Sequence, residues 1–223
     1  MKNYSVFDVI GPRMIGPSSS HTAGAARIAL AARKVAHEKI KSVKFYLHGS
    51  FAQTYKGHGT DKALVGGFMG FATDDERIRN SFEIARENGL EFEFIPTNLG
   101  EEFHPNTVKV VMTKYDGSTL EVIGESIGGG NIKIVGINGL ELEFTGSFST
   151  LIVKQWDKPG AAAHITSCVA KNDINIAFMR IYREEKGENA FTIIEADNDI
   201  PDAVVADIKS DKAIIQDAFI IRL

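Results

Sequence analysis

The sequence contains a single cysteine, Cys168, among its 223 residues. One thiol excludes an internal disulfide framework, and it excludes a structural zinc or iron–sulfur site built from this chain alone. Long apolar runs are also missing, because none reaches the roughly 18 residues that span a bilayer. The N-terminus shows no apolar segment followed by a small-residue cleavage site, so we expect no secretory signal and a cytoplasmic location.

Clustered positive charge is missing as well. The formal net charge is -4, and acidic and basic residues are interspersed without a run of lysine or arginine. Nucleic acids and anionic membranes are bound through clustered positive charge, so neither is an expected partner. A chain of this length with 43% hydrophobic residues has enough apolar surface for two ordinary domains with cores.

The first part of the chain predicts an α+β domain, with helices early and strands late. Apolar residues recur at helical spacing from Ala25 to Val35, and the pattern over 74–89 predicts a second amphipathic helix that ends at Asn88–Gly89. A glycine-rich loop leads into a short helix near Thr60. Alternating patterns predict strands, two pairs of which form hairpins turning at Asp–Gly and Asn–Gly: 42–49, 91–97, 107–125 and 131–144.

The run of predicted strands ends between Gly146 and Thr150, where a new pattern of strands and helices begins. From there to the C-terminus the sequence predicts the order β-α-β-β-α-β. Asn172–Asp173 closes the first helix of this part, and Pro201 opens the second. That order predicts a ferredoxin-like fold. We therefore expect two domains, residues 1–147 and 148–223.

The stretch PSSSHT precedes the alanine-rich helix with more hydroxyls than a helix start requires. A helix N-terminus leaves unpaired backbone N–H groups and attracts anions. One of Ser18, Ser19, Ser20 and Thr22 can be the N-cap, and the others are surplus to capping. They are candidates for holding a small carboxylate; the alternative is an exposed serine-rich turn ahead of a helix.

Three of the six histidines lie in predicted loops. His58 stands between glycines in KGHGTD, His104 precedes proline in FHPNT, and His21 follows the serines. Loops carry function on rigid scaffolds, and an imidazole titrates near neutral pH, so these three are candidate functional groups. The remaining three histidines fit structural positions: His37, His48 and His164.

A further glycine-rich stretch is SIGGGNI, which holds Gly128, Gly129 and Gly130. Glycine allows a backbone to approach a ligand closely, and the alternative is a strand bulge or tight corner. In this order, SVFDVIGPRMIGPSSSHTAGAAR, KGHGTDKALVGG, FHPNTV and SIGGGNI closely resemble the beta-chain family of iron–sulfur-dependent L-serine dehydratases. The resemblance covers essentially the whole chain. The second domain resembles an ACT domain, and the first is similar to the allosteric substrate-binding domain of some phosphoglycerate dehydrogenases.

The resemblance implies α,β-elimination of water from L-serine, giving pyruvate and ammonia without pyridoxal phosphate. In that family a 4Fe-4S cluster acts as Lewis acid on the serine hydroxyl. Such a cluster normally needs three cysteine thiolates, and this chain has one. The cluster is therefore expected on a partner alpha chain, with no metal ligand in this chain and no activity of this chain alone.

The resemblance also implies roles for the motif residues. His58 is the preferred general base, with Asp61 orienting or charging it, and His104 is the second acid–base or substrate-binding candidate. The expected substrate-binding residues are Ser18, Ser19, Ser20, His21, Thr22, Asn106, Gly128, Gly129 and Gly130. Which histidine does what is not readable from their spacing.

In the ACT-like domain, Asp157, Pro159 and Gly160 lie between the first strand and the first helix. In ACT domains that loop often binds a regulatory amino acid at a dimer interface, which implies a regulatory site and homodimerisation. The alternative is a plain turn in a module used only to dimerise. Cys168 lies mid-helix among apolar residues, as a core residue does.

Two other function classes compete with the dehydratase. In one, this chain is a non-catalytic amino-acid sensor and all chemistry lies on its partner. In the other, it is a serine hydrolase that uses Ser19 or Ser20 with His21. The hydrolase is disfavoured because adjacent residues at a helix start rarely reach nucleophile–base geometry, and no nucleophile-elbow motif is present.

Overall fold

The computed structural model describes residues 13–183 and 185–222. The chain splits into two compact units, and the division lies between Gly139 and Leu140. The domain boundary predicted at 147/148 stays a prediction. Residues 5–12, which begin the first sequence motif, lie outside the described residues. No helix among the described residues is long and apolar enough to cross a membrane.

A six-stranded sheet has the order β2-β1-β3-β4-β5-β6. The β1–β2 pair is parallel, whereas β1–β3, β3–β4 and β4–β5 are antiparallel. The strands fall where alternation predicted them: β1 Ile40–Leu47, β2 Glu91–Pro96, β3 Thr107–Lys114, β4 Thr119–Gly128, β5 Asn131–Ile137 and β6 Leu140–Phe144.

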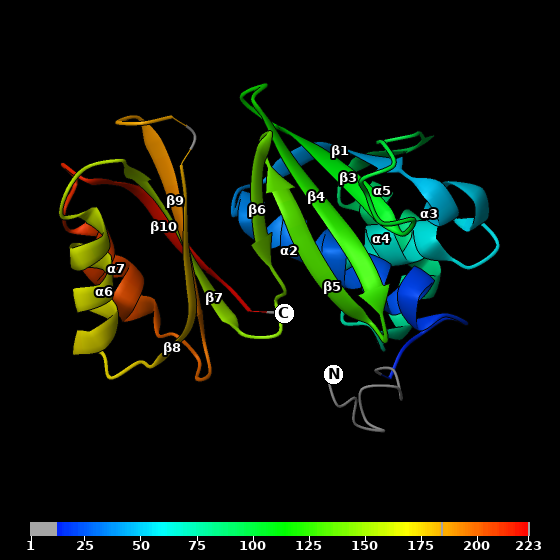
Figure 1. Cartoon of the computed structure of the whole chain (residues 1–223). Coiled ribbons are helices and arrows are strands. Elements are labelled where there is room, and N and C mark those ends of the chain that lie inside the picture. The colour runs from blue at the N-terminus through cyan, green and yellow to red at the C-terminus, as the bar shows by residue number, and fades with distance from the viewer. Residues whose placement is uncertain (1–12, 184, 223) are drawn as a thin grey trace. The chain divides into compact units, whose positions relative to one another are not determined.

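Helices cover one face of this sheet (Figure 1). They are η1 Ser19–Gly24, α2 Ala25–Ala36, α3 Gly49–Thr54, α4 Thr60–Phe68, η2 Glu76–Asn80 and α5 Ser81–Glu87. The apolar stripe of α2 packs on β3, β4 and β5. Helices α2 and α4 approach so closely that a Cβ on Gly67 would lie 2.0 Å from the Ala26 carbonyl oxygen.

Two parts of the helical prediction were incomplete. The helix predicted over 74–89 is a 3-10 turn, η2, followed by the shorter α5. Asp75 caps the start of η2, because its carboxylate accepts the backbone N–H of Arg77. Helix α3 was not predicted, since six residues are too few to show a helical period.

The second unit contains the predicted β-α-β-β-α-β fold. Its antiparallel sheet has the order β10-β7-β9-β8, and Figure 1 shows both helices on one face of it. The core between them includes Leu151, Val153, Ile165 and Ile194. The elements are β7 Ser149–Trp156, α6 Ala161–Lys171, β8 Ile176–Arg183, β9 Asn189–Ala196, α7 Asp202–Lys209 and β10 Ile215–Ile221.

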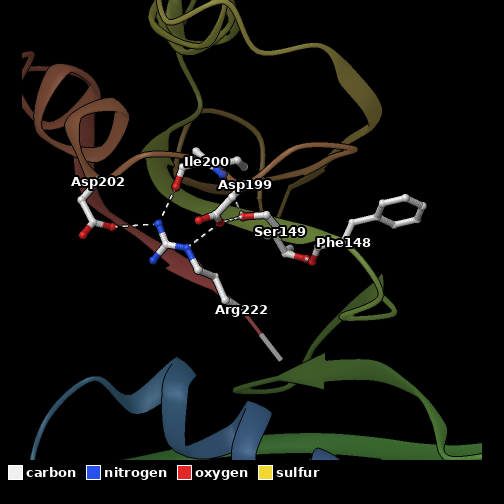
Figure 2. A network of polar contacts seen from close by, with 7 residues as sticks. Phe148, Ser149, Asp199, Ile200, Asp202 and Arg222 are labelled. Carbon is white, nitrogen blue, oxygen red and sulfur yellow. Dashed lines mark hydrogen bonds and ion pairs between the residues drawn. The ribbon is translucent and has the colours of Figure 1, made fainter. Parts of the chain in front are cut away.

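A polar network joins the ends of this unit's strands (Figure 2). The Arg222 guanidinium lies 2.7 Å from Asp199 and 3.0 Å from Asp202, and it donates to the Ile200 carbonyl. Ser149, at the start of β7, donates to Asp199 over 3.1 Å and accepts the Ile200 N–H over 3.1 Å. The loop before α7 is thereby tied to both β7 and the residue after β10.

Candidate active site

The serine–histidine segment forms a single π-helical stretch, η1, that runs directly into α2. Ser18 is the N-cap, because its Oγ accepts the His21 backbone N–H over 3.1 Å. Thr22 is buried, and its hydroxyl donates to the His58 carbonyl over 3.2 Å. Thr22 therefore holds the His58 loop in place, and Ser19 and Ser20 remain the surplus hydroxyls of this segment. Short π-helical segments are frequent at functional sites.

The structure brings His21 and His58 together. Their ring centroids are 4.8 Å apart with the planes at 62°, and the His21 ring also contacts Phe51 at 5.3 Å. Burial lowers the pKa of His21, and the neighbouring His58 lowers it further. Two imidazoles this close disfavour two positive charges, so both causes favour the neutral form of His21.

Unpartnered polar atoms gather in the predicted motifs. Among the described residues, four buried side-chain polar atoms have no hydrogen-bond partner, and three of them are His58 Nδ1, Thr60 Oγ1 and Asn106 Oδ1. Buried polar groups are normally paired, since leaving one unpaired costs about 1–3 kcal/mol. Atoms left in this state are suited to binding a ligand.

A closed circuit of hydrogen bonds links four separate segments around these histidines. His21 Nε2 lies 2.9 Å from Ser50 Oγ, and the Ser50 N–H donates to the Pro105 carbonyl over 2.8 Å. The Ser126 N–H donates to the neighbouring Asn106 carbonyl over 2.9 Å. Ser126 Oγ then donates to the Ser20 carbonyl over 2.9 Å, which returns the circuit to η1. We call this set the four-segment circuit.

His104 lies in the loop that the circuit passes through, but its ring is used locally. The ring nitrogen Nδ1 of His104 accepts the backbone N–H of Asn106 over 3.1 Å, and the backbone N–H of His104 donates to the Glu125 carboxylate over 3.2 Å. Within the described ranges, no hydrogen bond or ring contact joins the His104 ring to His21 or His58. The acid–base role predicted for His104 stays a prediction.

A cavity of about 480 Å³ opens beside His58. Asp61 also lines it, and burial raises the pKa of the Asp61 carboxyl despite the hydrogen bond that it accepts from the Lys62 N–H. No hydrogen bond in the described part of the chain joins Asp61 to the His58 ring, so the predicted orienting role stays a prediction. The other polar residues that line the cavity are Thr22, Lys56, Lys62 and Arg79.

The three glycines of SIGGGNI turn the chain from β4 into β5. Gly128, Gly129 and Gly130 have φ values of +101°, +60° and +79°, a region that favours glycine. Arg27 of α2 donates to the Gly130 carbonyl over 3.0 Å and anchors the turn. The tight-corner alternative is thus present; whether a ligand also contacts these glycines stays a prediction.

The predicted regulatory residues occupy the loop between β7 and α6. Gly160 begins α6 with φ +93°, directly after Pro159. The Asp157 carboxylate pairs with Arg183 over 2.8 Å and accepts the Gly187 N–H over 2.9 Å. These bonds tie the loop to the β8–β9 hairpin, and effector binding at the loop stays a prediction.

Sequence reasoning missed Ser50, Ser126 and Thr60. Ser50 stands in none of the sequence motifs, and Ser126 begins SIGGGNI, of which only the glycines were predicted to bind; both hydroxyls reach the site only through the fold. Thr60 is part of KGHGTD but passes as an ordinary residue at a helix start. The available signal for Ser50 was Gly49, which ends the predicted strand 42–49 and lies two residues after the end of β1.

The side chains present do not fit an iron–sulfur cluster. No group of three or more histidine, cysteine or acidic residues within the described ranges could hold a metal ion. Cys168 is buried in α6 with its sulfur 3.9 Å from His164 Nε2, and burial raises the pKa of its thiol. Its predicted place in the core is correct.

These features define a two-part protein, in which an α+β unit with a histidine- and hydroxyl-lined site is followed by an ACT domain. The family model described as "Serine dehydratase beta chain" matches residues 5–135, and the "ACT domain" model matches residues 149–213. The chain therefore belongs to the serine dehydratase beta-chain family.

Individual relatives agree with the family. The chain is 45% identical to the "L-serine dehydratase, beta chain" of Peptoniphilus asaccharolyticus, over 92% of each protein. It is 44% identical to the "Probable L-serine dehydratase, beta chain" of Bacillus subtilis (strain 168), over 97% of each. A more distant similarity, 28% identity, joins 77% of this chain to 32% of the D-3-phosphoglycerate dehydrogenase of Bacillus subtilis (strain 168).

Proposed function

We propose that this chain is the beta subunit of an L-serine dehydratase, which eliminates water from L-serine together with an alpha chain. The observation that carries the proposal is the buried, unpartnered Nδ1 of His58 in a family motif, beside a cavity and next to a second imidazole. The family membership and the names of the relatives support the choice of substrate. The 4Fe-4S cluster is assigned to the alpha chain, because this chain lacks the thiolates to hold it.

His58 is the proposed base. Its Nδ1 takes the α-proton of serine, the electron pair of the Cα–H bond becomes the Cα–Cβ double bond, and the Cβ–O bond breaks. The departing hydroxide takes a proton, which the protonated His58 or solvent returns, and leaves as water. The aminoacrylate that forms is hydrolysed to pyruvate and ammonia. The absence of a hydrogen-bond partner for His58 Nδ1 supports this role, because this nitrogen can accept the α-proton when the ring proton is on Nε2.

His21 supports this step by staying neutral. If His21 were charged, its positive field would weaken His58 as a base, since the rings are 4.8 Å apart. The lowered pKa of His21 avoids that competition. We propose that Ser19 and Ser20, at the N-terminal end of η1, hold the substrate carboxylate.

The test is His58→Gln in the enzyme assembled with its alpha chain. We expect kcat for pyruvate formation to fall by about 10²-fold or more, with subunit assembly and iron content unchanged. His37→Asn is the matched control, because His37 ends α2 in the left-handed region that asparagine tolerates. Turnover that survives His58→Gln at the control's rate would remove His58 from the mechanism.

The ACT domain supports a second candidate, an amino-acid-sensing subunit whose partner performs all the chemistry. His58→Gln also distinguishes the catalytic beta subunit from the sensing subunit. A sensor would show a changed serine concentration for half-maximal activity with nearly unchanged kcat, whereas a catalytic base would show the loss in kcat.

A further inference from the structure

Ser50 makes the shortest polar contact of the His21 ring. Its Oγ lies 2.9 Å from Nε2, whereas the other ring nitrogen, Nδ1, lies 3.4 Å from Ser18 Oγ. The contact holds whichever nitrogen carries the proton, because a hydroxyl both donates and accepts. Ser50 comes from α3 and is 29 residues from His21 in sequence, so the bond joins two elements that the sequence leaves unconnected.

The backbone around Ser50 is held by hydrogen bonds and close packing. Its N–H donates to the Pro105 carbonyl over 2.8 Å, and a Cβ on Gly49 would lie 2.6 Å from that same oxygen. Gly49 has φ +52°, which favours glycine. One residue earlier, the His48 N–H donates to the Thr107 carbonyl over 3.0 Å. Ser50 is thus fixed to the loop before β3 on one side and to His21 on the other.

Without the Ser50 hydroxyl, the His21 ring would keep the longer contact to Ser18 and its edge contact with Phe51. Neither fixes the angle of the ring as a 2.9 Å bond does. That angle decides which edge of His21 faces His58, whose ring is 4.8 Å away.

We propose that Ser50 is a positioning residue, whose hydroxyl holds Nε2 of His21 and so fixes the face that His21 presents to His58. The inference deepens the proposed function and rests on it for its kinetic consequence. The link between Ser50 and His21 is measurable without it.

The first measurement uses the full chain labelled with ¹⁵N-histidine, in which long-range proton–nitrogen correlation reports the tautomer of each ring. Ser50→Ala should change the nitrogen shifts and tautomer balance of His21, and Ser50→Thr, which keeps a hydroxyl, should restore them. Ser118→Ala is the control, because its hydroxyl bonds Asp116 in an exposed turn. Ser50→Cys, a weak donor and acceptor, replaces Ser50→Ala if that variant does not fold.

The second measurement is serine dehydration by the assembled enzyme. Ser50→Ala should lower kcat by about tenfold and change KM by less than about twofold, since it disturbs geometry and leaves substrate contacts in place. Unchanged His21 nitrogen shifts in Ser50→Ala, or an unchanged kcat, would overturn the proposal. A wild-type assembly that does not dehydrate serine refutes the proposed function instead, while the nitrogen shifts still decide whether Ser50 holds His21.

Discussion

Gly24, the last residue of η1, offers the sharpest test of how the site is built. A Cβ at this position would lie 2.0 Å from Ser126 Oγ and 2.8 Å from Ser126 Cβ. Ser126 is fully buried, and its hydroxyl donates to the Ser20 carbonyl. Gly24→Ala therefore forces Ser126 to turn away or η1 to shift, and either movement breaks the four-segment circuit.

The size of the effect follows from three contributions. Alanine gains about 1 kcal/mol over glycine in a helix. Overpacking a tight contact costs about 1–3 kcal/mol, and the Ser20 carbonyl left without its donor costs about 1 kcal/mol more. The expected result is a net loss of about 1–3 kcal/mol in the free energy of unfolding, measured by urea denaturation of this chain.

Gly136→Ala is the matched control, because a Cβ there would lie at an ordinary 3.4 Å from Ile123. The pair Gly24→Ala with Ser126→Gly removes both close atoms, so it should lose less free energy than the two single changes added together. If Gly24→Ala were as stable as Gly136→Ala, the close packing of η1 against β4 would be wrong, and the circuit with it.

Three further predictions concern charge. Asp61→Asn should raise the free energy of unfolding near pH 7, because burial raises the pKa of the Asp61 carboxyl in the folded chain above its ordinary 3.8. Urea denaturation at about pH 3 should show no gain, because there the carboxyl is largely protonated in the folded and the unfolded chain alike. NMR titration should place the His21 midpoint below 6.5, and His58→Gln should raise that midpoint without restoring it fully, since burial is the larger cause. Asp157→Ala should cost about 1 kcal/mol in the same denaturation assay by removing its bonds to Arg183 and Gly187, and an equal stability would show that the β7–α6 loop is not held by this carboxylate.

Much of the fold was predictable because its signals are local. Alternation located the strands, and Asn172–Asp173 ends α6 as predicted, with Asp173 at positive φ. The exceptions are short. Helix α3 has six residues, and the side chain of Asp75 caps a 3-10 turn at the start of the segment predicted as one α-helix.

The site was predictable only in part. His58 lies in a turn as predicted, whereas His21, predicted in a loop, lies in the π-helical stretch η1; the functional roles of both histidines stay predictions. Their contact was not readable, since 36 residues separate the two segments joined by the Thr22–His58 hydrogen bond. Which serine caps the helix was also open, and the structure selects Ser18 by a bond to a backbone N–H that any residue at 21 would supply.

The same reasoning explains why the hydroxyls of Ser50 and Ser126 gave no signal of their own, although Ser126 begins SIGGGNI. The four-segment circuit passes through backbone carbonyls of Ser20, Pro105 and Asn106, and a carbonyl accepts a hydrogen bond whatever side chain its residue carries. The fold instead restricts the residues at positions where two segments of the circuit come so close that a side chain would not fit. Gly24 and Gly49 are those residues, because a Cβ on either would lie within 2.6 Å of a circuit atom. In this site Gly24 and Gly49 indicate, more clearly than the hydroxyl residues do, which segments pack against one another. Substituting either glycine is therefore expected to disturb the contact between His21 and His58 more than substituting Ser19 does.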